Sequence, residues 1–345
     1  MTLSRAYLIQ YGISGMTKLH ELAMLHEPHG FFSPEFKNVL NEIQPEDFLL
    51  TDRNKNTPLH RSAASGSIAF VPKELLNQKT LLHQEKNGET ILFKILKYGH
   101  TDILPKEFWD TVEFSTICSP EDTILTAAAR FRQLHKLPPH YLTFDNLADD
   151  SHKESAFYVA ACNGTLDQLP ETMLTQEMIT LHSFAGESIL EAAIVNHNIE
   201  QIPTKLITKG NLEMHSFDGN TMLHILALTN KISHIDPRLI DAKMCEKKNV
   251  LAQTVYSIAL KTGSFQTIPK ECISWKTLLK SEENTNYTLL DKIIKAKQTD
   301  LLLGTDAPEE IREVLGEQWW AQNKAVLGQL KRVTNKEEPV ELDIF

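Results

Sequence analysis

Histidines and cysteines are the residues of this chain that could carry chemistry, and their spacing supports little of it. Residues 20–24, His-Glu-Leu-Ala-Met, begin like the helix of a zinc protease, but Met24 stands where the second metal ligand is required. A metal-dependent enzyme built on His20, His26 and His29 in the same region remains as an alternative. The four cysteines are far apart and include no Cys-x-x-Cys pair. We therefore predict a protein that is not an enzyme, with no catalytic residue, no bound metal and no cofactor.

Composition describes an ordinary folded chain. Of its 345 residues, 41% are hydrophobic and 23% are charged, and the formal net charge is -10. A negative chain is poorly suited to neutralising phosphates, so we expect no direct contact with nucleic acid. No stretch approaches the ~18 apolar residues of a membrane span, and the first residues lack the apolar core of a signal peptide. We expect a protein of the cell interior that does not bind membranes.

The strongest pattern is an internal repeat. A Thr or Ser, called here the lead residue, is followed two positions later by an apolar residue and three positions later often by His. From Thr57 onward, successive lead residues are 32 to 34 positions apart. A fixed period of this length is typical of stacked repeat proteins. The lead residues are Thr17, Thr57, Thr90, Thr123, Ser155, Ser188, Thr221, Thr254 and Thr288.

Two further columns keep the same register and predict two helices in each repeat. The lead hydroxyl can cap a first helix, and a glycine nine positions later can end it. Proline stands fifteen positions after the lead residue, and because proline suits the first turn of a helix, we expect a second, shorter helix to begin near it. The glycines are Gly66, Gly99, Gly164 and Gly263, and the prolines are Pro72, Pro105, Pro138, Pro170, Pro203 and Pro269, with Pro237 late by one position.

The repeat resembles the ankyrin family, most completely at residues 57–66, which read Thr-Pro-Leu-His-Arg-Ser-Ala-Ala-Ser-Gly. This resemblance implies an all-α solenoid of about nine helix–turn–helix units over residues 15–305. Two departures mark a divergent array: the proline column, which is similar to bacterial arrays of this kind, and about seven extra residues in the first unit. We expect this insertion, which contains residues 26–34, to form an enlarged loop.

The ends of the chain should differ from the repeats, because terminal units must present a polar face to water. We predict an N-terminal cap over residues 1–14 and a C-terminal capping helix over residues 306–332. The capping helix has a start signal of an N-cap residue, an early proline and acidic residues. Residues 333–345 are expected to be a flexible acidic tail.

The resemblance implies a function in protein–protein interaction, with a partner lying along the concave groove formed by the turn tips and the first helices. Partner identity and oligomeric state do not follow from it. Aromatic and arginine side chains supply most hot spots in interfaces. For two of the aromatic residues, Phe184 and Phe217, packing between neighbouring units is an equal alternative. The predicted contact residues are Lys97, Tyr98, Arg130, Phe131, Phe184, Phe217 and Asp218.

The tail provides a second hypothesis from another class. Residues 341–345 are similar to the short peptides by which bacterial proteins bind the sliding clamp of DNA polymerase, with Leu342, Ile344 and Phe345 at the apolar positions. Glu341 replaces the usual Gln. An adaptor that docks through its tail is therefore the alternative function. Either function places the protein in the cytoplasm of a bacterium or, if it is secreted as an effector, in a host cell.

Overall fold

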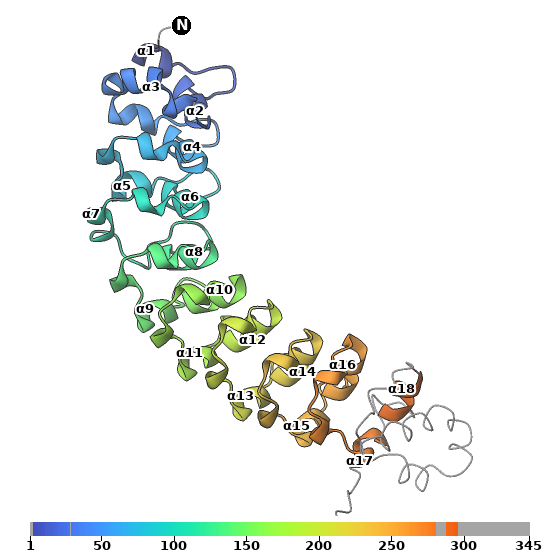
Figure 1. The fold of residues 1–345 in the computed structure, drawn as a ribbon. Helices are drawn as coiled ribbons and strands as arrows, with labels where there is room; N and C mark the ends of the chain where they lie inside the picture. Colours follow the sequence, from blue (N-terminus) through green and yellow to red (C-terminus); the bar gives the residue numbers. More distant parts are fainter. Residues whose placement is uncertain (1–2, 28, 281–287, 296–345) are drawn as a thin grey trace, which may run out of the picture. The chain divides into compact units, whose positions relative to one another are not determined.

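The computed structural model describes residues 3–27, 29–280 and 288–295, and every regular element within these ranges is a helix (Figure 1). The predicted all-α class is thus confirmed at the level of secondary structure. The chain divides into two compact units, Met1–Ala185 (unit 1) and Gly186–Phe345 (unit 2), which are described separately. Unit 1 contains α1 (Arg5–Leu8), α2 (Lys18–Ala23), α3 (Pro34–Val39), α4 (Pro58–Ser65), α5 (Gln78–Leu81), α6 (Ile91–Tyr98), α7 (Lys106–Trp109), α8 (Ile124–Arg130), α9 (Phe144–Ala148), α10 (Ala156–Asn163) and α11 (Gln176–Thr180). Unit 2 contains α12 (Ile189–Val195), α13 (Lys209–Glu213), α14 (Met222–Leu228), α15 (Ala242–Glu246), α16 (Val255–Thr262), α17 (Trp275–Leu278) and α18 (Leu289–Lys295).

Each lead residue begins a first helix, as predicted. Its hydroxyl oxygen accepts a hydrogen bond from the backbone N–H three residues later, at 3.0–3.4 Å. This bond satisfies one of the amides that the first turn of a helix leaves unpaired. The first helices are α2, α4, α6, α8 and α10 in unit 1, and α12, α14, α16 and α18 in unit 2.

The glycine column ends these helices in the left-handed conformation, also as predicted. Gly66, Gly99, Gly164 and Gly263 have φ values of 65–83°. Three repeats without a glycine keep the same backbone, and there Arg132, His197 and Asn230 have φ values of 57–62°. A side chain in this region costs about 1 kcal/mol, so the stacking of the repeats must impose the conformation.

A second helical segment begins near the proline column, as predicted, but in most repeats it opens as a 3-10 turn and the α-helix follows later. A 3-10 turn follows the proline, as in Lys73–Leu75 after Pro72, and the α-helix begins later at Gln78. Only α7 begins directly after its proline. The later start has a physical cause, because the side chain twenty positions after the lead residue caps the helix from that point. The capping residues are Asn77, Thr143, Thr175, Thr208, Asp241 and Ser274.

Within each unit the first helices pack in series. In unit 1, α2 contacts α4, α4 contacts α6, α6 contacts α8 and α8 contacts α10 (Figure 1). In unit 2, α12 contacts α14, α14 contacts α16 and α16 contacts α18. A buried hydroxyl ten positions after the lead residue links neighbouring helices by donating to a carbonyl of the preceding one. These bonds are Ser67 to Ala23 at 3.0 Å, Thr165 to Ala129 at 2.7 Å and Ser264 to Ala227 at 3.4 Å.

The insertion in the first repeat is more ordered than the enlarged loop that we expected. Ser33 caps α3, and the rings of Phe31 and Phe36 stack with their centroids 4.2 Å apart. Phe48 meets Phe31 edge to face, and all three rings are fully buried. The insertion therefore builds a small aromatic core, because its phenylalanines hide more apolar surface as a helix than as a loop. The predicted capping helix 306–332 and the tail with Leu342, Ile344 and Phe345 lie outside the described residues.

Candidate interaction surface

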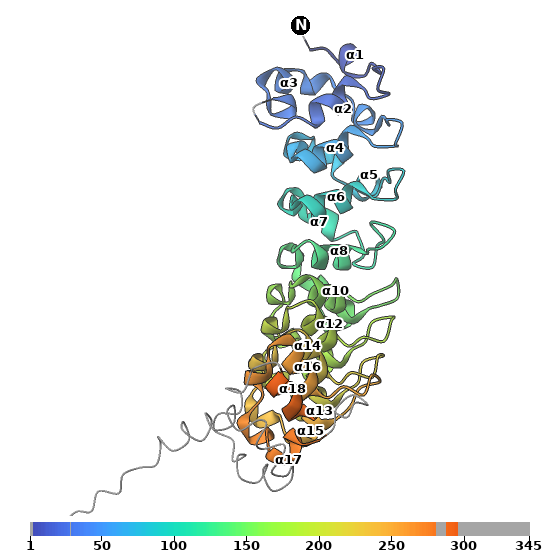
Figure 2. The ribbon, with the colours of Figure 1, turned by 90° about the vertical axis from the view of Figure 1, so that its right-hand side faces the viewer.

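The turns before the first helices are narrow loops held by their own hydrogen bonds. In two of these turns, the side chain five positions before the lead residue holds the loop. Asp52 accepts hydrogen bonds from the backbone amides of Asn54 and Asn56, at 2.8 and 2.9 Å. Asn249 accepts equivalent bonds from two backbone amides of its own turn. In both units these turns project from one side of the helices (Figure 2). The residues at their tips are thus held in place while pointing outward. Antiparallel bridges close the turns at Tyr11–Thr17, Gln84–Thr90, Ile117–Thr123, His215–Thr221 and Lys248–Thr254.

In unit 1 the surface of the turns and first helices is built from ion pairs. Arg61 pairs with Asp52 at 2.7 Å, and the Lys94 ammonium lies 3.1 Å from Glu85 and 2.9 Å from Glu89. Burial alone would lower the pKa of Lys94, but its hydrogen bonds to Glu89 and Glu85 outweigh burial and raise that pKa. The lysine therefore stays charged although only 13% of its side chain is exposed. These pairs hold each turn against its own helix.

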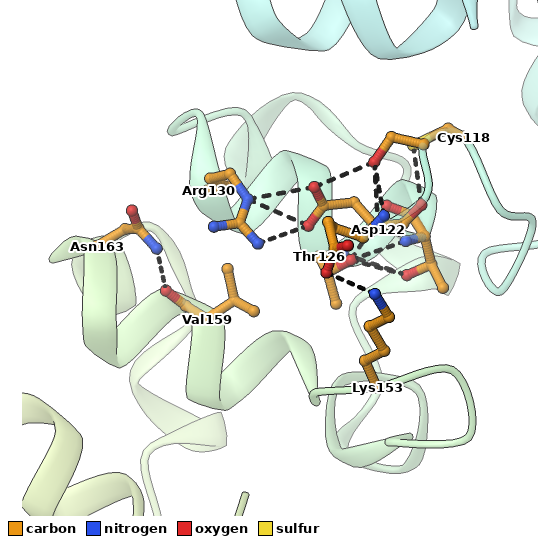
Figure 3. A network of polar contacts seen from close by, with 10 residues as sticks. Cys118, Asp122, Thr126, Arg130, Lys153, Val159 and Asn163 are labelled. Carbon is orange, nitrogen blue, oxygen red and sulfur yellow. Dashed lines mark hydrogen bonds and ion pairs between the residues drawn. The ribbon is translucent and has the colours of Figure 1, made fainter. Parts of the chain in front are cut away.

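Arg130, a predicted contact residue, belongs to the same kind of network. Its guanidinium donates hydrogen bonds of 2.8–3.2 Å to the Asp122 carboxylate (Figure 3). The Ser119 hydroxyl donates to the same carboxylate at 3.3 Å. The Asp122 side chain is 3% exposed, whereas that of Arg130 is 38% exposed. Arg130 is therefore needed to neutralise a buried acid, and only its outer edge is available to a partner.

Of the other predicted residues of the central repeats, Phe131 and Lys97 lie against Phe93, and Tyr98 follows on the same helix. Phe131 is half-buried and packs edge to face on the Phe93 ring, with the centroids 5.4 Å apart. The Lys97 ammonium lies 5.6 Å from the same ring and 3.4 Å from Glu89. Tyr98, at the end of α6, is 48% exposed. Of this group, Tyr98 has the largest free apolar surface, and Phe131 already contributes to packing.

Phe184 and Phe217 both point into solvent, so the alternative that they fold inward is wrong. Phe184 occupies the last turn of unit 1 and is 91% exposed, and Phe217 occupies a turn of unit 2 and is 94% exposed. Asp218, beside Phe217, is also exposed. Hiding either ring would have removed apolar area from water, yet both stand at turn tips, where the described residues leave them almost fully uncovered.

The sequence interpretation missed four exposed apolar residues of unit 2. Val250 is 74% exposed and Leu251 is 68% exposed, and they occupy the turn positions that match Phe217 and Asp218 in the next repeat. Val195 and Leu228, at the ends of α12 and α14, are each 49% exposed. The repeat register contained the signal, since Val250 stands four positions before its lead residue, as Phe217 does, and Val195 and Leu228 stand seven positions after theirs, as Lys97 and Arg130 do.

The exposed turns of unit 2 are joined to each other. Val250 covers Gly219, and a Cβ atom added to Gly219 would lie only 2.7 Å from a Val250 methyl group. The Asn249 amide donates to the Asn220 side chain at 2.8 Å. The turns that carry Phe217 and Val250 therefore contact one another, and the exposed residues Phe217, Val250 and Leu251 at their tips are called here the apolar edge.

The repeat histidines are structural residues. The Nδ1 atoms of His20 and His224 accept from the lead amides at 3.2 Å, so Nε2 carries the proton and donates to carbonyls of Asn56 and Lys247 at 2.9 and 3.0 Å. His60 makes the same bond to Thr57, but its buried Nε2 has no hydrogen-bond partner among the described residues. Burial lowers the pKa of all three rings, that of His60 to about 3. The rings are therefore neutral at pH 7.

Catalytic features do not gather in the described part of the chain. No group of three or more His, Cys, Asp or Glu side chains within it could hold a metal ion. A groove of about 510 Å³ lies between the segment after Pro72 and α7, but its charged residues, Lys73, Glu74 and Glu107, are all exposed. A catalytic pocket would bring titratable groups together away from water.

Within the described ranges, no helix combines the length and apolar character that crossing a bilayer requires.

Comparison with known proteins gives likenesses in structure alone. No family model matches the chain, and no curated protein matches it. A solved complex of a predatory endopeptidase from Bdellovibrio bacteriovorus with an immunity protein is similar over 56% of this chain and 98% of that chain, with a TM-score of 0.40 and 19% sequence identity.

Proposed function

We propose that this protein is a divergent ankyrin-type repeat protein that binds another protein along its turn tips and first helices. The architecture proposed is a solenoid of about nine helix–turn–helix units. The recurrence of three capping columns supports it, at the lead residue, nine positions later and twenty positions later. Units of this length cannot bury their apolar faces alone, so they stack and leave a long surface exposed.

The exposed apolar side chains at the turn tips support the binding function most directly. Phe217, Val250 and Leu251 in unit 2 and Phe184 in unit 1 are each at least 68% exposed. Large apolar side chains gathered on an exposed face usually mark a protein contact, and aromatic residues dominate the energetics of such contacts. The proposal includes no catalytic step.

Affinity purification from cells that produce the tagged protein, followed by mass spectrometry, tests this function. Two forms are compared with the wild type: a triple variant, Phe217→Ser with Val250→Ser and Leu251→Ser, and a control variant, Ile13→Ser. Ile13 is 99% exposed at the equivalent tip of the first repeat, so the control removes a similar side chain from unit 1. We expect a partner that is retained by the wild type and the control but is lost from the triple variant.

Two results would count against the function. Recovery of the same proteins by all three forms would place binding elsewhere. A triple variant that unfolds at a lower temperature than the wild type would show that these side chains stabilise the fold, contrary to their exposure. Tyr98→Ala examines unit 1 in the same way, since Tyr98 is the most exposed of the predicted residues around Phe93.

A further inference from the structure

Unit 2 presents five exposed apolar residues, Val195, Phe217, Leu228, Val250 and Leu251, here called the unit 2 apolar face. Val195 and Leu228 stand seven positions after their lead residues, and Phe217 and Val250 stand four positions before theirs. Because α12 contacts α14 and α14 contacts α16, equivalent residues are offset by one helix-packing distance, roughly 8–10 Å. The face thus offers apolar contacts at a regular interval along the helix stack.

Two charges of opposite sign border this face. Asp218 follows Phe217 on one turn, and Lys248 precedes Val250 on the next. Both are exposed, and neither has an ion-pair partner in the part of the chain that the structure describes. By contrast, Lys247 beside Lys248 pairs with Glu213 at 3.4 Å. The apolar edge therefore carries an unmatched negative charge on one turn and an unmatched positive charge on its neighbour.

The potential around Asp218 is negative for a further reason. Burial raises the pKa of the Glu191 carboxyl, and the nearby charges of Glu187 and Asp218 raise it further. A cation placed near Asp218 would stabilise the charged form of both acids. On the neighbouring turn, an anion would match Lys248. Charge pairs at the edge of an interface fix the orientation of a partner more than they add affinity.

We propose that the unit 2 apolar face binds a partner segment with two or more apolar anchors, a basic residue at its Asp218 end and an acidic residue at its Lys248 end. This inference rests on the proposed function and adds the chemistry and the direction of the bound segment. The apolar anchors cover Phe217, Val250 and Leu251 and exclude water around the two charge pairs. The charge pairs then select one of the two directions in which a segment could lie across the turns.

Selection from a phage-displayed library of random 16-residue peptides on the immobilised full-length chain tests this proposal. We expect enriched peptides to share apolar anchors with a basic residue on one side and an acidic residue on the other. The triple variant Phe217→Ser with Val250→Ser and Leu251→Ser should bind these peptides at least about tenfold more weakly. Ile13→Ser is the matched control and should bind them unchanged.

A charge exchange tests the direction. In the double variant Asp218→Lys with Lys248→Asp, the selected peptides should bind several-fold more weakly, and synthetic peptides with their end charges exchanged should recover the lost affinity. Equal binding of both peptide sets to both forms would overturn the proposed direction. Peptides that bind the triple variant as tightly as the wild type, or a library that yields no enriched peptide, would overturn the apolar face as the binding site.

Self-association and membrane contact are separate outcomes. Sedimentation of the wild type as a dimer and of the triple variant as a monomer would mean that a second copy of this chain covers the face. Binding of the wild type to phosphatidylglycerol vesicles that is lost in the triple variant would mean that lipid covers it. Either result overturns the inference. Purification from cells remains an independent test of the proposed function, since a partner could be captured through other residues.

Discussion

Unit 1 and unit 2 use the same repeat positions for different purposes. In the central repeats of unit 1, charged side chains of the turns and first helices neutralise one another, as Lys94 does with Glu85 and Glu89. In unit 2 the matching turns carry Phe217, Val250 and Leu251, which touch little of their own chain. The capping columns are common to both units, so backbone geometry does not cause the difference.

Within a repeat, the residues that stabilise the fold are therefore different from the residues that face solvent. The side chains of the lead residues and of the other capping residues hydrogen-bond to the backbone. Many different flanking residues are compatible with these bonds. Turn tips and the ends of the first helices are free to vary, since they contribute little to packing. The central repeats of unit 1 use this freedom for ion pairs that fasten their turns, whereas the turns of Phe217 and Val250 in unit 2 use it for exposed apolar side chains, as the turns of Ile13 and Phe184 do in unit 1. Stability should therefore respond to surface mutations in unit 1, and binding should respond to them in unit 2.

Acidification should give the largest difference between the units. Burial lowers the folded-state pKa of His20 and His60 in unit 1 and of His224 in unit 2. The unfolded chain takes up these protons below about pH 6.5, so the stabilising contribution is complete above that pH and is lost as the pH falls toward the folded values. Between pH 7.5 and pH 5.5 His60, whose folded pKa is about 3, should cost roughly 1.4 kcal/mol, and His20 adds to this loss, so unit 1 should lose more stability than unit 2.

Hydrogen exchange at the two pH values, corrected for intrinsic rates, measures both units in one sample. Glu191 should reduce the loss in unit 2 further, because its raised pKa means that protonation at lower pH relieves an unfavourable charge. Equal losses in the two units would contradict the assignment of this pH dependence to the repeat histidines.

Removal of one paired cation tests the charged surface of unit 1. Lys94→Met leaves the Glu85 carboxylate, whose side chain is 7% exposed, without a cation, and should lower the free energy of unfolding by about 2–3 kcal/mol. Lys248→Met in unit 2 removes an exposed lysine with no ion-pair partner among the described residues and should cost less than about 0.5 kcal/mol. Urea denaturation followed by circular dichroism compares them. Similar midpoints for the two variants would show that the unit 1 pairs do not stabilise its turns.

Two phenylalanines provide a smaller contrast. Phe131→Ala removes a half-buried ring that packs on Phe93 and should lower stability by about 1–2 kcal/mol. Phe131, a predicted contact residue, would then also be a packing residue. Phe217→Ala should leave the melting temperature unchanged, because the ring is 94% exposed. Differential scanning calorimetry measures both, and a lower melting temperature for Phe217→Ala would mean that the ring is packed in solution.

The sequence predicted the elements that depend on short-range capping, and it missed those that depend on competition between signals. Lead residues such as Thr57 cap their helices because the hydroxyl and the amide lie three positions apart, which the sequence shows directly. The second helical segment begins near Pro72 as predicted, but the later start of its α-helix was missed, because Asn77 caps that helix five positions after the proline. A column of Asn, Asp, Ser and Thr twenty positions after the lead residue was present to be found.

The candidate surface was predicted less completely than the fold. The repeat register identified Phe184 and Phe217 at turn tips, but it could not decide whether they pointed inward, because burial depends on the neighbouring turn. The partners of Arg130 and Phe131 were missed for the same reason. Asp122 lies next to the lead residue Thr123, and only the folded turn shows that its carboxylate needs the guanidinium. Val250 and Leu251 could have been predicted from the column that contains Phe217.

The smallest effect that we predict concerns the backbone of matching turns in the two units. Two positions before the lead residue, unit 1 has Gly88 with φ of 81° and unit 2 has Ala252 with φ of 58°. This left-handed conformation is open to glycine and strained for alanine. Ala252→Gly should therefore raise the free energy of unfolding, by no more than about 1 kcal/mol, because the greater freedom of glycine in the unfolded chain offsets part of the relief.

The reverse substitution should lower the free energy of unfolding, and by a larger amount. Gly88→Ala introduces the strain that Ala252 already bears, and its new methyl group would lie 2.9 Å from the Pro120 ring. We expect a loss of about 1–2 kcal/mol by urea denaturation. Gly210→Ala serves as a control, because Gly210 lies within α13 without a positive φ and has no atom closer than 3.7 Å to the added carbon. If Ala252→Gly destabilised the protein as much as Gly88→Ala does, the two turns would not share a backbone, and the equivalence of their tip residues would fail with it.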